Sequence, residues 1–122
     1  MKSKFFDLAV RIARNSEHPK YRVGAVVVRN GVILGVGANS MKTHPKSNTH
    51  HRRIHAELKA ILNAQDDVTG ADIYITRITK KWECACSFPC ASCQALLEES
   101  GIRNVYATDN NGDRLLWRTL NG

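Results

Sequence analysis

The sequence VGAVVVRNGVILGV, residues 23–36, contains two apolar runs separated by Asn30 and Gly31. Both runs are rich in β-branched residues, which favour strands, and an Asn-Gly pair is typical of a two-residue hairpin turn. Strands that are joined by so short a turn must be antiparallel. The stretch therefore predicts a β-hairpin, with strands at 23–28 and 32–36, as the beginning of a sheet.

The remaining segments predict three helices, two further strands and a short tail. Helices are expected over residues 4–15, from Ile54 to a point before Gly70, and from about Cys90 to Ser100, with Gly101 as a C-terminal stop. Strands are expected at 71–75 and 102–107, and an irregular segment at 77–89. This order indicates an α/β fold with helices packed on a mixed sheet.

The tail decides how the sheet ends. Residues 109–113 form a polar turn, and residues 114–120 leave no room for a crossover helix. A fifth strand beside the fourth would therefore have to be antiparallel. The alternative is a short terminal helix with no fifth strand, so the prediction is a sheet of about five strands whose last strand is antiparallel or absent.

Length and charge limit the classes of protein to consider. The chain has 122 residues, which suggests one domain, and it contains no apolar run long enough to span a membrane. Its first seven residues become charged too soon for a signal peptide, so a cytoplasmic protein is expected. The net charge of +7 favours an anionic partner, either a nucleotide phosphate or a nucleic acid, although a merely basic surface is the alternative.

The cysteines are crowded into one short segment. All four lie between positions 84 and 93, as Cys84, Cys86, Cys90 and Cys93. Disulfides in small scaffolds usually tie distant segments together, so this crowding suits metal ligation or catalysis better.

Two motifs at predicted helix starts indicate a metal site. His55-Ala56-Glu57 opens the second helix, and Pro89-Cys90-Ala91-Ser92-Cys93 opens the third. Cysteines at i and i+3 share a helical face, and a helix N-terminus favours a thiolate. One imidazole and two thiolates give Zn²⁺ three protein ligands and leave the fourth position for a water, whose pKa zinc can lower to about 7. Glu57 would lie close enough to share a proton with that water.

A structural zinc knot is the competing interpretation. It would use all four cysteines, Cys84, Cys86, Cys90 and Cys93. Such a knot would explain the clustering but would leave the histidine motif without a role, and four ligands in so short a stretch strain a tetrahedral geometry.

The ordered motifs resemble a known family. H-x-E followed by P-C-x-x-C matches the zinc-deaminase pattern, and Val23-Gly24-Ala25-Val26 and Gly37-Ala38-Asn39 precede it in family order. The sequence thus resembles the cytidine and deoxycytidylate deaminase superfamily from the first helix to about Tyr106, and is most similar to compact, phage-like deoxycytidylate deaminases. In that family, a helix and a parallel fifth strand typically follow. This chain departs from the pattern at that point.

This resemblance implies a fold and a set of functional residues. The fold would be a three-layer α/β/α domain over residues 1–122. Zn²⁺ would be held by His55, Cys90 and Cys93, and Glu57 would transfer protons. Asn39 and the backbone around Ala56 would contact the substrate, and the Tyr106 ring would stack on the base. Turn formation is the alternative role for Asn39, and core packing is the alternative for Tyr106.

The resemblance also implies a reaction. The expected enzyme is a hydrolytic deaminase that converts a cytosine nucleotide, first of all dCMP to dUMP, releases ammonia and assembles as a homo-oligomer. Alternatives are a deaminase of cytosine or adenine in single-stranded nucleic acid, a guanine deaminase, and a non-enzymatic nucleic-acid-binding module with structural zinc. Further candidates for contacts are residues of the polar loop and of the cysteine segment: His44, His50, His51, Arg52, Arg53, Trp82 and Phe88.

Overall fold

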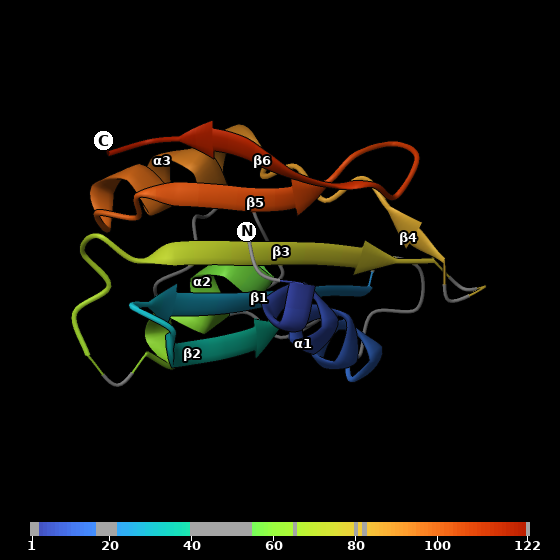
Figure 1. Ribbon diagram of the computed structural model, residues 1–122, viewed down its shortest axis with the longest axis horizontal. Helices are drawn as coiled ribbons and strands as arrows, with labels where there is room; N and C mark the ends of the chain where they lie inside the picture. The colour runs from blue at the N-terminus through green and yellow to red at the C-terminus, as the bar shows by residue number, and fades with distance from the viewer. Residues whose placement is uncertain are drawn as a thin grey trace.

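The computed structural model describes residues 3–16, 22–39, 55–64, 66–79, 81 and 83–121. Its helices and strands follow in the order α1 (Ser3–Arg14), β1 (Arg22–Arg29), β2 (Val32–Ala38), α2 (Ala56–Leu62), β3 (Asp72–Ile78), β4 (Cys84–Ala85), α3 (Ala91–Glu99), β5 (Asn104–Thr108) and β6 (Arg114–Thr119) (Figure 1). Within these residues, none of the helices has the length and apolar character needed to cross a lipid bilayer.

The strands form one mixed sheet. Its order is β2-β1-β3-β5-β6, and the two-residue strand β4 pairs with β3 outside this path. Strand β1 is antiparallel to both β2 and β3, β3 is parallel to β5, and β5 is antiparallel to β6. The predicted mixed sheet with an antiparallel last strand is confirmed, and the tail is a strand rather than a helix. Strand β4 was not predicted, because its two residues lie in the segment that was expected to be irregular.

The hairpin of β1 and β2 has the predicted turn. Asn30 has a φ of 52° and Gly31 a φ of 78°, the two positive values that a type I′ turn requires. This turn fixes the antiparallel register in which Gly24 faces Ala38 and Arg29 faces Val32.

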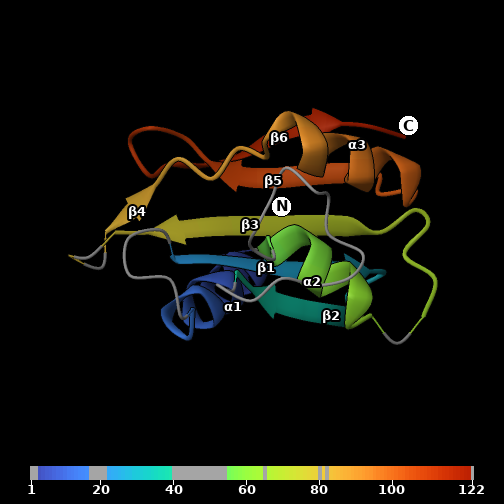
Figure 2. The same ribbon diagram turned by 180° about the vertical axis from the view of Figure 1, so that it is seen from behind.

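Helices cover both faces of the sheet, as the three-layer prediction required. Helix α1 lies on one face, and α2 and α3 lie on the other, as the two opposite views in Figures 1 and 2 show. Side-chain alternation in the strands supplies a core for each layer. Ala25, Val27, Ile73 and Ile75 belong to the core beneath α2 and α3, whereas Val26, Val28 and Tyr74 belong to the core beneath α1.

Two glycines of β2 allow α2 to approach the sheet closely. A Cβ atom at Gly35 would lie 2.4 Å from the Ala60 carbonyl oxygen, and one at Gly37 would lie 2.6 Å from the Ala60 nitrogen. Any side chain at these positions would push the helix away from the strand. The glycines therefore permit the short distance between α2 and β2.

Candidate metal centre

The topology brings the starts of α2 and α3 to one edge of the sheet. Strands β2, β3 and β5 all run in the same direction, because β2 and β3 are each antiparallel to β1 and β5 is parallel to β3. Helix α2 follows β2, and α3 follows the β3–β4 segment, so both helices begin near the C-terminal ends of these strands. Ligands in α/β proteins collect at such an edge.

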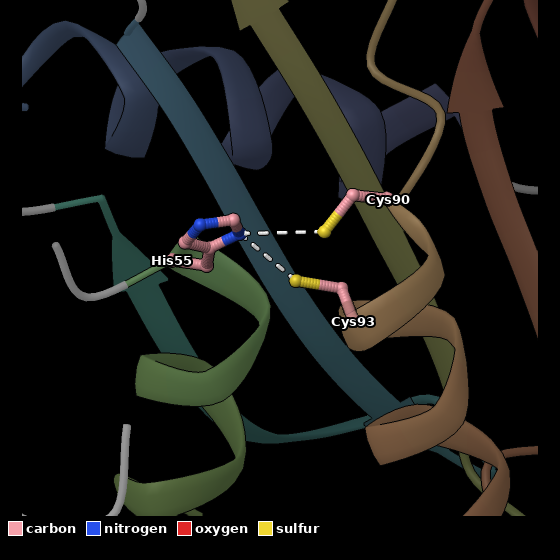
Figure 3. Close-up of side chains that lie close together, drawn as sticks. All are labelled: His55, Cys90 and Cys93. Atoms are coloured by element: carbon pink, nitrogen blue, oxygen red, sulfur yellow. Dashed lines mark hydrogen bonds between the residues drawn. The ribbon is translucent and has the colours of Figure 1, made fainter. Parts of the chain in front are cut away.

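The two helices present their first side chains to each other. His55 is the N-cap residue of α2 and Cys90 is the N-cap residue of α3, and both have extended backbone angles. Neither side chain makes a capping hydrogen bond to its own helix. Instead, the imidazole of His55 points toward the two thiols at the start of α3 (Figure 3).

The three side chains form a compact group of metal-ligand atoms. The Nδ1 atom of His55 lies 3.0 Å from the Sγ of Cys93 and 3.9 Å from the Sγ of Cys90, and all three atoms lie within 4.8 Å of one another. A tetrahedral zinc ion with bonds of about 2.0 Å to nitrogen and 2.3 Å to sulfur needs ligand atoms about 3.5 to 3.8 Å apart. The observed distances lie on either side of these values, so the donor set fits Zn²⁺.

In the described part of the chain, the group offers three candidate ligand atoms. Among the described residues, no further histidine, cysteine, aspartate or glutamate side chain belongs to it. Cys84 and Cys86 are half-buried free thiols on and after β4, and they lie outside the group. The geometry therefore favours the three-ligand site over the all-cysteine knot. Cys93 is buried while Cys90 is exposed, so the site is reached from solvent on one side.

Glu57 lies beside this group in the first turn of α2. Its side chain is 5% exposed, and its carboxyl group is hydrogen-bonded to the Cys93 thiol. Burial raises the pKa of Glu57 above its ordinary value, against the opposing effects of a hydrogen bond to its own backbone N–H and of the bond to Cys93. A carboxyl group whose pKa is shifted toward neutrality is suited to both accepting and donating a proton.

The thiol of Cys93, by contrast, must lose its proton to bind a metal ion. Burial raises the pKa of its thiol far above the ordinary value, and the negative charges of Glu57 and Cys90 raise it further. The buried group is therefore a neutral thiol in the metal-free chain, and a cation in the group would be needed to stabilise the thiolate. Metal binding should accordingly displace the Cys93 proton.

Zinc affinity should therefore rise with pH. Between about pH 6 and pH 8 we expect at least about a tenfold gain per pH unit, because each binding event must release the proton that the raised pKa of Cys93 holds. Titration against a competing chelator at several pH values measures this slope. Cys84→Ser is the control and should have the wild-type slope. An affinity that does not change with pH would show that Cys93 is not a ligand.

Two of the predicted substrate contacts, Asn39 and Ala56, lie at the end of β2 and at the start of α2. Asn39 directly follows β2, and its Oδ1 accepts hydrogen bonds from the Val23 N–H, at 2.9 Å, and from the Ser16 hydroxyl. This oxygen holds Asn39 at the sheet edge, beside the beginning of β1. Ala56 is the first residue of α2 and is buried. Its N–H belongs to the first helical turn, whose N–H groups have no carbonyl partner within the helix.

The structure does not bring Tyr106 to the metal centre. Its ring stacks on that of Tyr74, with centroids 4.6 Å apart, and packs against the core beneath α1. This is the face of the sheet opposite to α2 and α3. The placement favours core packing over base stacking as the role of Tyr106.

The cysteine segment is held by a stacking contact with an aromatic residue of β6. The ring of Phe88, which is 39% exposed, stacks on that of Trp117 at a centroid distance of 5.6 Å. The guanidinium of Arg118 lies 4.6 Å from the centre of the Trp117 ring. Phe88 therefore attaches the loop to β6. The other candidate contacts fall outside the described residues: His44, His50, His51, Arg52, Arg53 and Trp82.

Comparison with known proteins agrees with this site. The family model for the cytidine and deoxycytidylate deaminase zinc-binding region matches residues 1–108. An uncharacterized deaminase in the luxG 3′ region of Aliivibrio fischeri is 32% identical over 120 residues, which cover 92% of this chain and 75% of that protein. The human deoxycytidylate deaminase is 30% identical over 117 residues, and this chain spans only 60% of its length, while 83% of this chain is covered.

A solved structure has the same fold. The dCMP deaminase of the cyanophage S-TIM5, in its apo form, superimposes with a TM-score of 0.66 at 24% identity, over 90% of this chain and 86% of that one. With the metal-ligand group, these likenesses define a zinc-dependent hydrolytic deaminase. The chain belongs to the cytidine and deoxycytidylate deaminase family.

Proposed function

We propose that the chain deaminates a cytosine nucleotide, converting dCMP to dUMP with release of ammonia, and that residues 1–122 act as one domain. The observation that carries the proposal is the group of His55, Cys90 and Cys93 with buried Glu57 against it. The proposal also includes the predicted cytoplasmic location and homo-oligomeric state.

The protein side of the chemistry follows from the character of each group. His55, Cys90 and Cys93 would hold Zn²⁺, which supplies a water that is acidic enough to act as a nucleophile at neutral pH. Both thiols lie at the start of α3, where the helix dipole stabilises negative charge. A tetrahedral ion held by the three atoms of the described group would keep one coordination position for water.

Glu57 would carry the protons of the reaction. Its carboxylate accepts a proton from the attacking water, donates it to the ring nitrogen next to the amine-bearing carbon, and then transfers the water's second proton to the departing amine. Water is consumed, ammonia leaves and uracil remains, so Glu57 is regenerated. Its raised pKa suits this alternation, since the group must hold a proton at one stage and release it at the next.

The choice of substrate is supported by charge and by likeness. A net charge of +7 favours a phosphorylated substrate over a neutral nucleoside. The human relative is a deoxycytidylate deaminase, and so is the cyanophage protein of the same fold. Asn39 and the backbone of Ala56, at the sheet edge and at the start of α2, are the proposed substrate contacts.

A screen of ammonia release tests the substrate. The zinc-loaded protein should be compared on dCMP, CMP, cytidine, guanine and a short single-stranded oligonucleotide. We expect dCMP to exceed cytidine by at least about tenfold in kcat/KM, which corresponds to about 1.4 kcal/mol of added binding to the phosphate.

Each other outcome has a definite meaning. A preference for uncharged cytidine would contradict the phosphate argument. Activity on the oligonucleotide alone would favour the nucleic-acid deaminase, and activity on guanine alone would favour the free-base enzyme. No ammonia from any of the five compounds would favour a binding module with structural zinc.

A further inference from the structure

A buried pair of hydroxyl groups holds the segment that leads into the metal centre. Ser87 and Thr108 are 7% and 0% exposed. Thr108 is the last residue of β5, and the Ser87 hydroxyl lies against the carbonyl of Ile75, in the middle of β3. Ser87 is three residues before Cys90 in the connection from β4 to α3, which runs beside β5 in Figure 2. Neither residue belongs to a motif that the sequence analysis singled out.

The pair joins three parts of the chain through hydrogen bonds. The Ser87 hydroxyl donates to the Ile75 carbonyl oxygen at 2.7 Å and accepts from the Thr108 N–H at 2.8 Å. The Ser87 N–H donates to the Thr108 carbonyl oxygen at 2.9 Å. The Thr108 hydroxyl donates to the Ala85 carbonyl oxygen and lies 2.9 Å from the Ser87 Oγ. We call these contacts the Ser87–Thr108 bridge.

The bridge stands where the parallel strands β3 and β5 stop pairing. Their Cα register runs from Asp72 and Asn104 to Tyr74 and Tyr106 and ends there. Beyond this last pair, the Ser87 hydroxyl connects the carbonyl of Ile75 on β3 to the N–H of Thr108 on β5. The cysteine segment is thus inserted between the two strands at the point where they separate.

The chain has little conformational freedom between the bridge and the first thiol. Only Phe88 and Pro89 separate Ser87 from Cys90; Phe88 is stacked on Trp117, and the ring of Pro89 fixes its φ angle. From Cys90 the helix begins at once, since its carbonyl accepts the Gln94 N–H at 2.8 Å.

We propose that Ser87 and Thr108 are positioning residues of the metal centre, which set where the thiols of Cys90 and Cys93 lie relative to His55. This inference rests on the ligand set given under the proposed function. Neither Ser87 nor Thr108 belongs to the group of candidate ligands. The bridge fixes the backbone that carries two of the three ligands, while α2 carries the third independently.

Zinc affinity of the folded protein tests the proposal. Thr108→Val keeps the volume of the side chain but removes its hydroxyl, and we expect zinc to bind about tenfold to a hundredfold more weakly, the range found when groups that orient ligands are lost. Thr108→Ser restores the hydroxyl and should recover most of the affinity. Ser87→Ala, which leaves the Thr108 N–H and the Ile75 carbonyl without their shared partner, should weaken zinc binding at least as much.

Two control variants separate positioning from general stability. Thr76→Val makes the same change on β3, at a buried hydroxyl that has no hydrogen-bond partner in the described part of the chain, and should leave zinc affinity unchanged. Val26→Ala opens a cavity beneath α1 and should lower the melting temperature of the metal-free protein without changing zinc affinity.

The measurements are zinc affinity by chelator competition, the visible absorption of the Co²⁺-loaded protein, and the melting temperature of the metal-free protein. Wild-type zinc affinity in both Thr108→Val and Ser87→Ala would overturn the proposal, whatever their melting temperatures. So would a loss of affinity in Val26→Ala equal to theirs. If instead the wild-type protein itself binds no zinc, or Cys93→Ser binds it normally, it is the proposed ligand set that fails.

Discussion

Glu57→Gln lowers turnover of the best substrate by about a hundredfold to ten-thousandfold, the contribution of a positioned acid-base group. Glutamine keeps the size of the side chain but can neither accept nor donate the proton that the reaction moves. Because Glu57 is not part of the ligand group, the variant should still bind one zinc ion per chain. The loss should therefore fall on kcat while zinc content stays at the wild-type value.

Ammonia release together with the zinc content of the same samples measures this effect. Glu99→Gln, at an exposed position of α3, is the matched control and should have wild-type activity. An active Glu57→Gln enzyme with full zinc would refute the role of Glu57.

The metal-free form of the same variant gives a second readout. Since burial raises the pKa of Glu57, the unfolded chain loses this proton at lower pH than the folded chain, and the side chain makes the fold less stable as pH rises. Metal-free Glu57→Gln should therefore melt at a higher temperature than the wild type at neutral pH. The gap should close below the ordinary pKa of a glutamate, at about pH 4.

Two double substitutions separate the three-ligand site from the zinc knot. Replacing Cys90 and Cys93 with serine should reduce bound zinc from about one ion per chain to nearly none and abolish turnover, because only the His55 ligand remains. Replacing Cys84 and Cys86 with serine should leave zinc content and turnover close to the wild type.

Zinc content after dialysis against a weak chelator is the measurement, and the two variants are matched in chemistry and number of changes. The knot predicts that both variants lose the metal. Zinc loss in the Cys84 and Cys86 variant, with its fold intact, would contradict the site described above.

Local patterns in the sequence were sufficient to predict most of the fold. The Asn30-Gly31 turn and the apolar, β-branched run at 23–28 depend on neighbouring residues only, and the predicted turn and strand are confirmed. The antiparallel last strand also followed from the short polar turn at residues 109–113, since so short a connection cannot make a crossover. The limits of some elements were less accurate: β3 extends beyond the predicted end at residue 75 to Ile78, whereas α2 ends at Leu62, before Gly70 as predicted.

The parts that could not be predicted depend on contacts between distant segments. The sequence placed Tyr106 on a strand, but alternation assigns its side chain to one of two faces without saying which helices cover that face. The ring lies on the α1 side because β5 pairs with β3 in a register that sets Tyr106 opposite Tyr74. The Ser87–Thr108 bridge likewise joins residues 21 positions apart and follows no local spacing rule.

The position of a bound metal tests the central claim most directly. A crystal structure of the zinc-loaded protein, with anomalous scattering measured at the zinc absorption edge, locates the ion and its ligands. We predict one ion bound to His55 Nδ1 and to the Sγ atoms of Cys90 and Cys93, with no fourth ligand atom from the protein. An ion bound by Cys84 or Cys86, or an imidazole of His55 remote from both sulfurs, would contradict the account.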